Sequence, residues 1–261
     1  MTWLLAYAAL GAVAGVLAGL MGIGGGLVIV PGLLFLFHLQ GFESSFLSHI
    51  AIGSSLAIIV PTALSSLWAH HKRGAIDWSV VLRLTPGLMF GALCGAWLAS
   101  QFSTDLLKTL FGLFLLMVAI QIFSGRNPDH GKTRGQGAAV FFPVGAVIGT
   151  VSGLVGIGGG TMTVPFLVWR GKTLPGSIAT SAACGLPIAV AGTLGFMLMG
   201  ADVGAGSSTG FVYWPAVVAV GLFAVLMAPA GARLAHSLPV PVLKKWFALL
   251  LVIVGARLLI G

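Results

Sequence analysis

The chain has 261 residues, of which 58% are hydrophobic and 7% are charged. A soluble domain carries about 25% charged residues, so this composition excludes a chain that covers itself with a water-facing surface. It predicts an all-α, polytopic membrane protein, because a helix of about 20 apolar residues spans a bilayer. The net charge of +8 comes from basic residues in short loops between the apolar runs, and no nucleic-acid-binding pattern accompanies it.

In chain order, the apolar segments form two similar sets. The first set comprises 3–20, a glycine-rich break at 21–26, and then 27–38, 46–69, 79–100 and 105–123. The second comprises 138–155, a break at 156–160, and then 161–169, 177–199, 212–235 and 242–260. Between them, 124–137 has the Gly, Pro and charge content of a solvated connection. We therefore predict a first membrane repeat over 1–123, a linker over 124–137 and a second membrane repeat over 138–261.

The internal repeat is clearest around the two breaks. Residues 15–33 read GVLAGLMGIGGGLVIVPGL and residues 149–167 read GTVSGLVGIGGGTMTVPFL, with eleven of nineteen positions identical at an offset of 134. The similarity continues more weakly, and Trp78 pairs with Trp214. The copies differ by a longer loop near 38–48 in the first and an extra Gly/Ser-rich segment from Gly204 to Gly210 in the second.

The basic residues predict how the two copies are oriented. If the segments around each break form a hairpin that returns to its starting side, whether or not it spans fully, the second copy is inverted. Eleven of the 13 Lys and Arg residues then lie on one side, with Lys108 and Arg257 on the other. If those segments make one continuous span, the copies run parallel and the split is seven to six. The positive-inside rule favours the hairpins, with both termini outside and the linker in the cytoplasm.

The glycine breaks are the strongest candidates for a binding site. Glycines free the backbone from helical dihedral angles, and a helix that restarts after them has N–H groups without intrahelical partners. Such a helix start suits an anion. We predict that two such starts, brought together by the inverted repeats, form a small-anion site from Gly22, Gly24, Gly25, Gly26, Gly156, Gly158, Gly159 and Gly160. The alternative is that these glycines only let helices pack closely.

Hydroxyl side chains near the breaks are candidates to complete this site. Thr161 and Thr163 open the short segment after the second break, and the Ser pair in 46–69 matches a Thr–Ser pair in 177–199. The candidate ligands from these segments are Ser54, Ser55, Thr161, Thr180 and Ser181. The alternative for each is a hydroxyl bonded to the backbone of its own helix.

The ionisable residues restrict the chemistry. His49 begins a segment beside the Ser pair, where it is a candidate proton-sensitive group or, alternatively, an interfacial histidine. All five Asp and Glu residues fall near segment ends or in loops. We therefore expect no metal site and no cofactor, and the sequence argues against a cation transporter and a hydrolytic enzyme.

The paired motifs GLMGIGGGLVIVP and GLVGIGGGTMTVP resemble the TauE/SafE family, as do HHKRGAIDW and the closing LKKWFALLLVIVGARLL. The resemblance covers nearly the whole chain and implies a bacterial or archaeal inner-membrane transporter, often one that exports sulfite, sulfoacetate or related organosulfonates. The chain departs from the family at Val212-Tyr213-Trp214, where an Asp often precedes the Trp, and in the inserted Gly204–Gly210 segment.

The leading hypothesis is a secondary transporter of small sulfur-containing anions that works by alternating access between inverted halves. An anion channel would use the same parts, and a non-transporting sensor or assembly subunit is a further alternative. We expect a small anionic substrate and the lipid bilayer as partners, and no nucleic acid. Association into a homo-oligomer stays open, as do the identity of the anion, the transport direction and the coupling ion.

Overall fold

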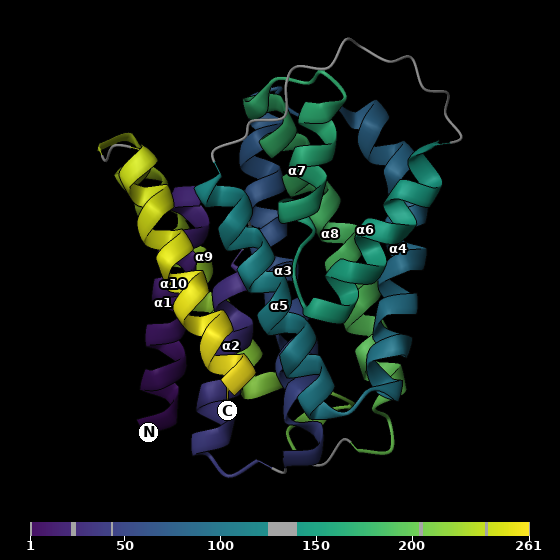
Figure 1. The fold of residues 1–261 in the computed structure, drawn as a ribbon, viewed down its shortest axis with the longest axis vertical. Helices are drawn as coiled ribbons and strands as arrows, with labels where there is room; N and C mark the ends of the chain where they lie inside the picture. The colour runs from purple at the N-terminus through teal and green to yellow at the C-terminus, as the bar shows by residue number, and fades with distance from the viewer. Residues whose placement is uncertain are drawn as a thin grey trace.

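The structure, a computed structural model, describes residues 2–21, 25–42, 44–124, 140–203, 206–237 and 240–260 and is almost wholly helical (Figure 1). The first half holds the helices α1 (Thr2–Met21), α2 (Gly26–Leu39), α3 (Leu47–Lys72), α4 (Trp78–Gln101) and α5 (Thr104–Phe123), with a 3-10 turn at Ser44–Phe46. The second half holds α6 (Phe141–Val155), α7 (Gly160–Trp169), α8 (Leu174–Met199), α9 (Trp214–Ser237) and α10 (Val240–Ile260).

The predicted segments match these helices to within three residues at each described end. One of the three-residue differences is at α8, which begins at Leu174 because Thr173 caps it. The Thr173 side chain accepts a hydrogen bond from the Gly176 N–H. Residues 212–213, predicted as helix, instead form strand β2 (Val212–Tyr213), paired antiparallel with β1 (Ser208–Thr209). The inserted segment is thus partly a small hairpin. The predicted linker 124–137 lies outside the described residues apart from Ser124.

The apolar surface and the helix lengths fit a polytopic membrane protein. Among the described residues, α3, α4, α5 and α8 are long and apolar enough to cross a membrane. Large apolar side chains such as Leu82, Ile120 and Leu198 are more than 60% exposed on these helices. Lipid can cover such side chains where water could not.

The two halves of the chain are intertwined. Helix α1 packs along α9, and the corresponding helix of the second half, α6, packs along α4. Glycines permit both close approaches: a Cβ at Gly15 would overlap the backbone of Ala224, and one at Gly91 would overlap the carbonyl oxygen of Ala146. Close packing, the alternative for the glycines in the breaks, therefore operates in the long helices.

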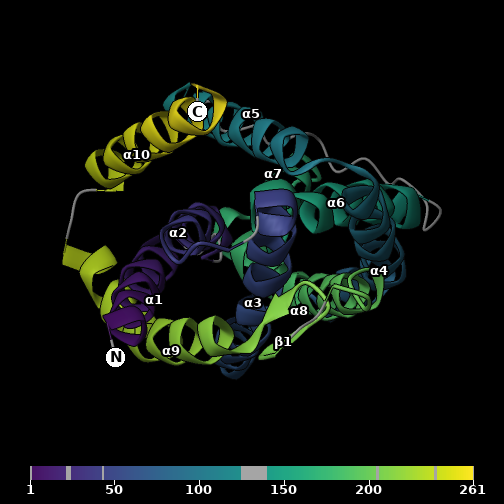
Figure 2. The same cartoon turned by 90° about the horizontal axis from the view of Figure 1, so that it is seen from below.

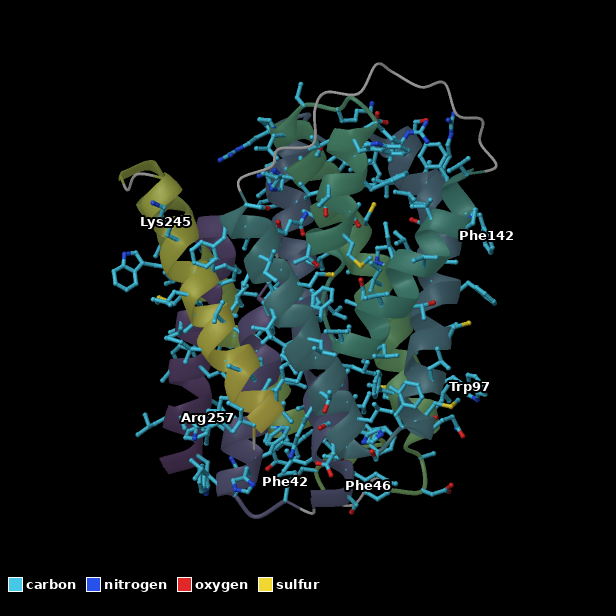
Figure 3. All side chains as sticks on the ribbon, in the orientation of Figure 1. Phe42, Phe46, Trp97, Phe142, Lys245 and Arg257 are labelled. Carbon is cyan, nitrogen blue, oxygen red and sulfur yellow. The ribbon has the colours of Figure 1, made fainter. Side chains whose placement is uncertain are left out.

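The hairpins at the two breaks open toward opposite ends of the molecule. The α1–α2 hairpin starts and ends at the lower end of Figure 1, and the α6–α7 hairpin at the upper end. Figure 2, seen from below, shows α3 at the centre, with α1 and α9 on one side and α4, α6 and α8 on the other. Figure 3 shows Lys245 toward the upper end of α10 and Arg257 toward its lower end. Inversion of the repeats relative to a membrane stays a prediction.

Candidate functional site

The second break is a buried turn between α6 and α7. Helix α6 ends at Val155 and is followed by Gly156, whose φ of +79° is left-handed, and α7 starts after Gly159, whose φ is +73°. Glycine alone adopts such angles at little cost. The carbonyl oxygen of Gly159 accepts the N–H groups of Met162 and Thr163 at 3.1 and 2.9 Å. Within the described residues, the N–H groups of Gly160 and Thr161 have no acceptor, as the first turn of a helix requires.

The first break has the same hydrogen bonds at its helix start, although Gly25 has a right-handed φ of −62° where Gly159 is left-handed. Gly25 precedes α2, and its carbonyl oxygen accepts the N–H groups of Val28 and Ile29 at 3.0 and 2.9 Å. These residues precede Gly159, Met162 and Thr163 by the repeat offset of 134. Gly22 and Gly24 lie outside the described residues.

The two breaks meet in the middle of the fold. A Cβ at Gly26 would lie 2.9 Å from the Gly156 carbonyl oxygen and 3.0 Å from the Ile157 Cα. On the other side of the second break, a Cβ at Gly185 of α8 would lie 2.8 Å from the Gly158 carbonyl oxygen. The start of α2 therefore lies against the second break, which is itself held between α3 and α8.

A hydroxyl that sequence reasoning left out of its candidate ligands adds to the second break. Thr163 is fully buried, and its Oγ1 has no hydrogen-bond partner in the described part of the chain. A Cβ placed on Gly159 would lie 3.6 Å from both Thr163 Oγ1 and Ser152 Oγ. At the offset of 134 the first copy has Ile29 and Ala18, so the repeat comparison could have marked these two hydroxyls as specific to the second copy.

The predicted hydroxyls divide between the breaks and the helix connections. Ser55 donates to the Gly156 carbonyl oxygen at 2.9 Å, so α3 holds the second break directly. Ser54 accepts the Tyr213 N–H at 2.9 Å, and Thr180 accepts the Asp77 N–H at 3.1 Å. None of these three bonds is to the residue's own helix. Ser181 is buried and has no partner among the described residues, and Thr161 is partly exposed at the start of α7.

His49 lies inside the helix bundle. Its side chain is 3% exposed, and its Nε2 is 3.0 Å from the Ala99 carbonyl oxygen. The ring packs against Phe211 at 5.0 Å and Phe46 at 5.9 Å between centroids. The structure brings His49 next to the inserted hairpin, and its depth in the membrane stays a prediction.

The charged residues of the site region lie outside the helices. Asp77, just before α4, forms an ion pair with Lys172, which lies between α7 and α8. The Lys172 ammonium holds the pKa of the Asp77 carboxyl below its usual value. The same carboxylate caps α4 by accepting the Val80 N–H at 3.3 Å. This ion pair joins a connection of the first half to one of the second.

Broken helical hairpins that meet at the centre of a polytopic helical protein are typical of membrane transporters. The comparisons agree with this class, and they identify the family. The chain belongs to the sulfite exporter TauE/SafE family, whose model matches residues 7–258. The resemblance predicted from the paired motifs is confirmed.

Relatives over the full length carry transporter names. A Haemophilus influenzae protein named "Probable membrane transporter protein" is 35% identical over 260 residues, covering 98% of each chain. "Probable membrane transporter protein YunE" of Bacillus subtilis is 26% identical, covering 96% of this chain and 95% of its own. A probable membrane transporter protein of Methanocaldococcus jannaschii is 26% identical, covering 96% and 93%.

Proposed function

We propose that this chain is a secondary transporter that exports small sulfur-containing anions, such as sulfite or organosulfonates, across the bacterial or archaeal inner membrane by alternating access. The observation that carries the proposal is the start of α7, where the N–H groups of Gly160 and Thr161 and the buried hydroxyl of Thr163 have no partner among the described residues. The family description, sulfite exporter, supports the choice of anion.

The chemistry of the break favours an oxyanion over a cation. Helix starts present N–H donors and the positive end of the helix dipole. Neutral donors of this kind bind a small anion without a permanent counter-charge, which helps the site release it again. Among the described residues, the acidic side chains Asp77, Asp105 and Asp202 all lie outside the breaks. A cation would find carbonyl oxygens there, but no carboxylate.

Flux measurements in proteoliposomes test the function. Labelled sulfite, sulfoacetate and sulfate would be offered to the purified protein with and without a proton gradient. We expect saturable uptake of at least one sulfur-containing anion, and counterflow against an unlabelled internal pool. Flux that rises linearly with concentration and shows no counterflow would indicate the alternative, an anion channel. Rates equal to those of protein-free liposomes for all three anions would exclude transport of these substrates.

Single cysteines test the proposed orientation, in which both termini lie outside and the basic loops in the cytoplasm. Arg73 and Asp202 are exposed at the ends of α3 and α8, and the two native cysteines, Cys94 and Cys184, are free thiols that can be replaced by Ala. In intact cells, an impermeant maleimide is expected to label Asp202→Cys and to leave Arg73→Cys unlabelled until the membrane is opened. Labelling of both cysteines in intact cells would contradict the inverted arrangement.

A further inference from the structure

The connection between α3 and α4, residues 73–77, is tied down by two backbone N–H groups. The Ala75 N–H bonds back to the His70 carbonyl oxygen, near the end of α3, at 3.3 Å. The Asp77 N–H bonds to the Thr180 hydroxyl of α8 at 3.1 Å. We call this segment the upper connector, because it lies at the upper end of Figure 1.

The connection between α8 and α9 repeats both bonds at the other end of the molecule. We call its residues 206–213, which contain β1 and β2, the lower connector (Figure 2). The Phe211 N–H bonds back to the Phe196 carbonyl oxygen of α8 at 3.2 Å. The Tyr213 N–H bonds to the Ser54 hydroxyl of α3 at 2.9 Å.

These bonds correspond residue by residue under the internal repeat. Ala75 and Asp77 precede Phe211 and Tyr213 by 136, the offset that also relates Trp78 to Trp214. The acceptors also correspond. His70, which accepts from Ala75, precedes Phe196, which accepts from Phe211, by 126. Ser54 precedes Thr180 by the same 126, as Pro61 precedes Pro187. The lower connector is longer by its insert and still makes both bonds. Two unrelated loops would have no reason to share this pattern.

Each acceptor hydroxyl is next in the chain to a buried serine, and one of these serines bonds to a break. Ser54 holds the lower connector, and Ser55 donates to the Gly156 carbonyl oxygen of the second break. Thr180 holds the upper connector, and its neighbour Ser181 is the equivalent of Ser55. The lower connector and the second break are therefore bonded to consecutive residues of α3.

Different side-chain interactions hold the two connectors in place. At the upper connector, Asp77 forms its ion pair with Lys172 from the α7–α8 connection. At the lower connector, the Tyr213 ring packs on Phe42, from the equivalent α2–α3 connection, at 5.1 Å between centroids. Phe211 adds packing on His49 and Phe46. Figure 3 shows Phe42 and Phe46 at the lower end.

We propose that the upper and lower connectors are the two gates of the transport path, and that Thr180 and Ser54 are their latch residues and not substrate ligands. Each gate opens when its N–H leaves its hydroxyl, the upper with loss of an ion pair and the lower with loss of aromatic packing. The adjacent Ser55 links the state of the lower gate to the second break. This inference rests on the proposed transport function.

Labelling of a cysteine at the break tests the gates without any substrate. The reporter is Thr161→Cys in a chain with Cys94→Ala and Cys184→Ala, treated with an impermeant thiol reagent in right-side-out and inverted vesicles. Ser54→Ala is expected to speed labelling about fivefold from the lower side only, as loss of one buried hydrogen bond allows. Thr180→Val is expected to do the same from the upper side only. The control, Thr62→Val on α3, removes a hydroxyl that bonds its own helix and is expected to change neither rate.

Two variants outside the helices test the same gates in case Ser54→Ala or Thr180→Val prevents the protein from folding. Lys172→Met is expected to speed labelling from the upper side only, and Phe42→Ala from the lower side only. Equal effects on both sides, or no effect of any of the four variants, would overturn the gates. One-sided effects without anion flux would support the gate proposal and exclude transport of the proposed anions. Anion flux without one-sided effects would support the transport function and contradict the gate proposal.

Discussion

Substituting Val for Gly159 is expected to abolish anion binding while the protein remains folded in the membrane. A Cβ at this position would overlap Ile188 Cδ1 and would lie 3.6 Å from Thr163 Oγ1 and Ser152 Oγ. It would therefore fill the space beside the start of α7, where Gly160 and Thr161 have no N–H acceptor in the described part of the chain. An anion that loses several charge-assisted hydrogen bonds, each roughly 1.5–3 kcal/mol, is expected to bind at least about 100-fold more weakly. Isothermal titration of the purified variant with sulfite or sulfoacetate measures this.

The control for this substitution is Gly41, because a branched residue at Gly159 also strains the backbone. Gly41 has the same φ of +73°, and a Cβ there would meet nothing within 4 Å. Gly41→Val therefore imposes a similar strain of about 1–2 kcal/mol, far from the breaks. We expect Gly41→Val to bind and transport as the unmodified chain does. Retained binding in Gly159→Val would place the anion elsewhere, and lost binding in both variants would reduce the effect to strain.

Local sequence signals predicted the helices and the breaks well. Apolar runs of bilayer length are a strong signal, and a run of glycines between two of them permits few interpretations. The shared hydrogen bonds at Gly25 and Gly159 also follow from the repeat, since both glycines precede a helix at an offset of 134. The helices, the breaks and the helix starts all depend on residues that are close together in the chain.

The partners of the hydroxyls could not be predicted in this way. Ser54 and Thr180 were candidate ligands because they match across the copies, and their match is real. Their acceptor role depends on connectors from the other half of the chain. The connector residues match between the copies at an offset of 136, whereas the hydroxyls match at 126. The symmetric bonds are visible only when both offsets are known. The inserted hairpin was hidden for a related reason, since two short strands of two residues each give no periodic signal.

The largest stability effect is expected at the crossing of α4 and α6. Six glycines lie at this crossing, and a Cβ at any of them would overlap backbone atoms of the other helix: Gly87, Gly91 and Gly95 of α4, and Gly145, Gly149 and Gly153 of α6. At Gly91 the overlap is with the Ala146 carbonyl oxygen, which cannot rotate away as a side chain can. Gly91→Ala is therefore expected to separate the helices and to cost about 2–3 kcal/mol. The midpoint temperature of thermal unfolding in detergent should fall by roughly 5 to 10 °C.

The matched control is the same substitution at Gly221 of α9, where the nearest atom to an added Cβ is Pro61 Cγ at 3.7 Å, an ordinary contact. Gly221→Ala is expected to stabilise slightly, because Ala favours a helix over Gly by about 0.5–1 kcal/mol. Equal unfolding temperatures for the two variants would show that the helices can separate at no cost.

A second substitution across the same crossing separates steric overlap from a general loss of stability. A Cβ at Gly149 would overlap the Leu88 carbonyl oxygen, so Gly149→Ala alone is expected to cost about as much as Gly91→Ala. Once one Cβ has moved the helices apart, the second meets less backbone, and the double variant should cost clearly less than the sum. Because α6 leads directly into Gly156, a displaced α6 also moves the second break. Anion binding is therefore expected to weaken in step with this separation, whereas Gly221→Ala should leave it unchanged.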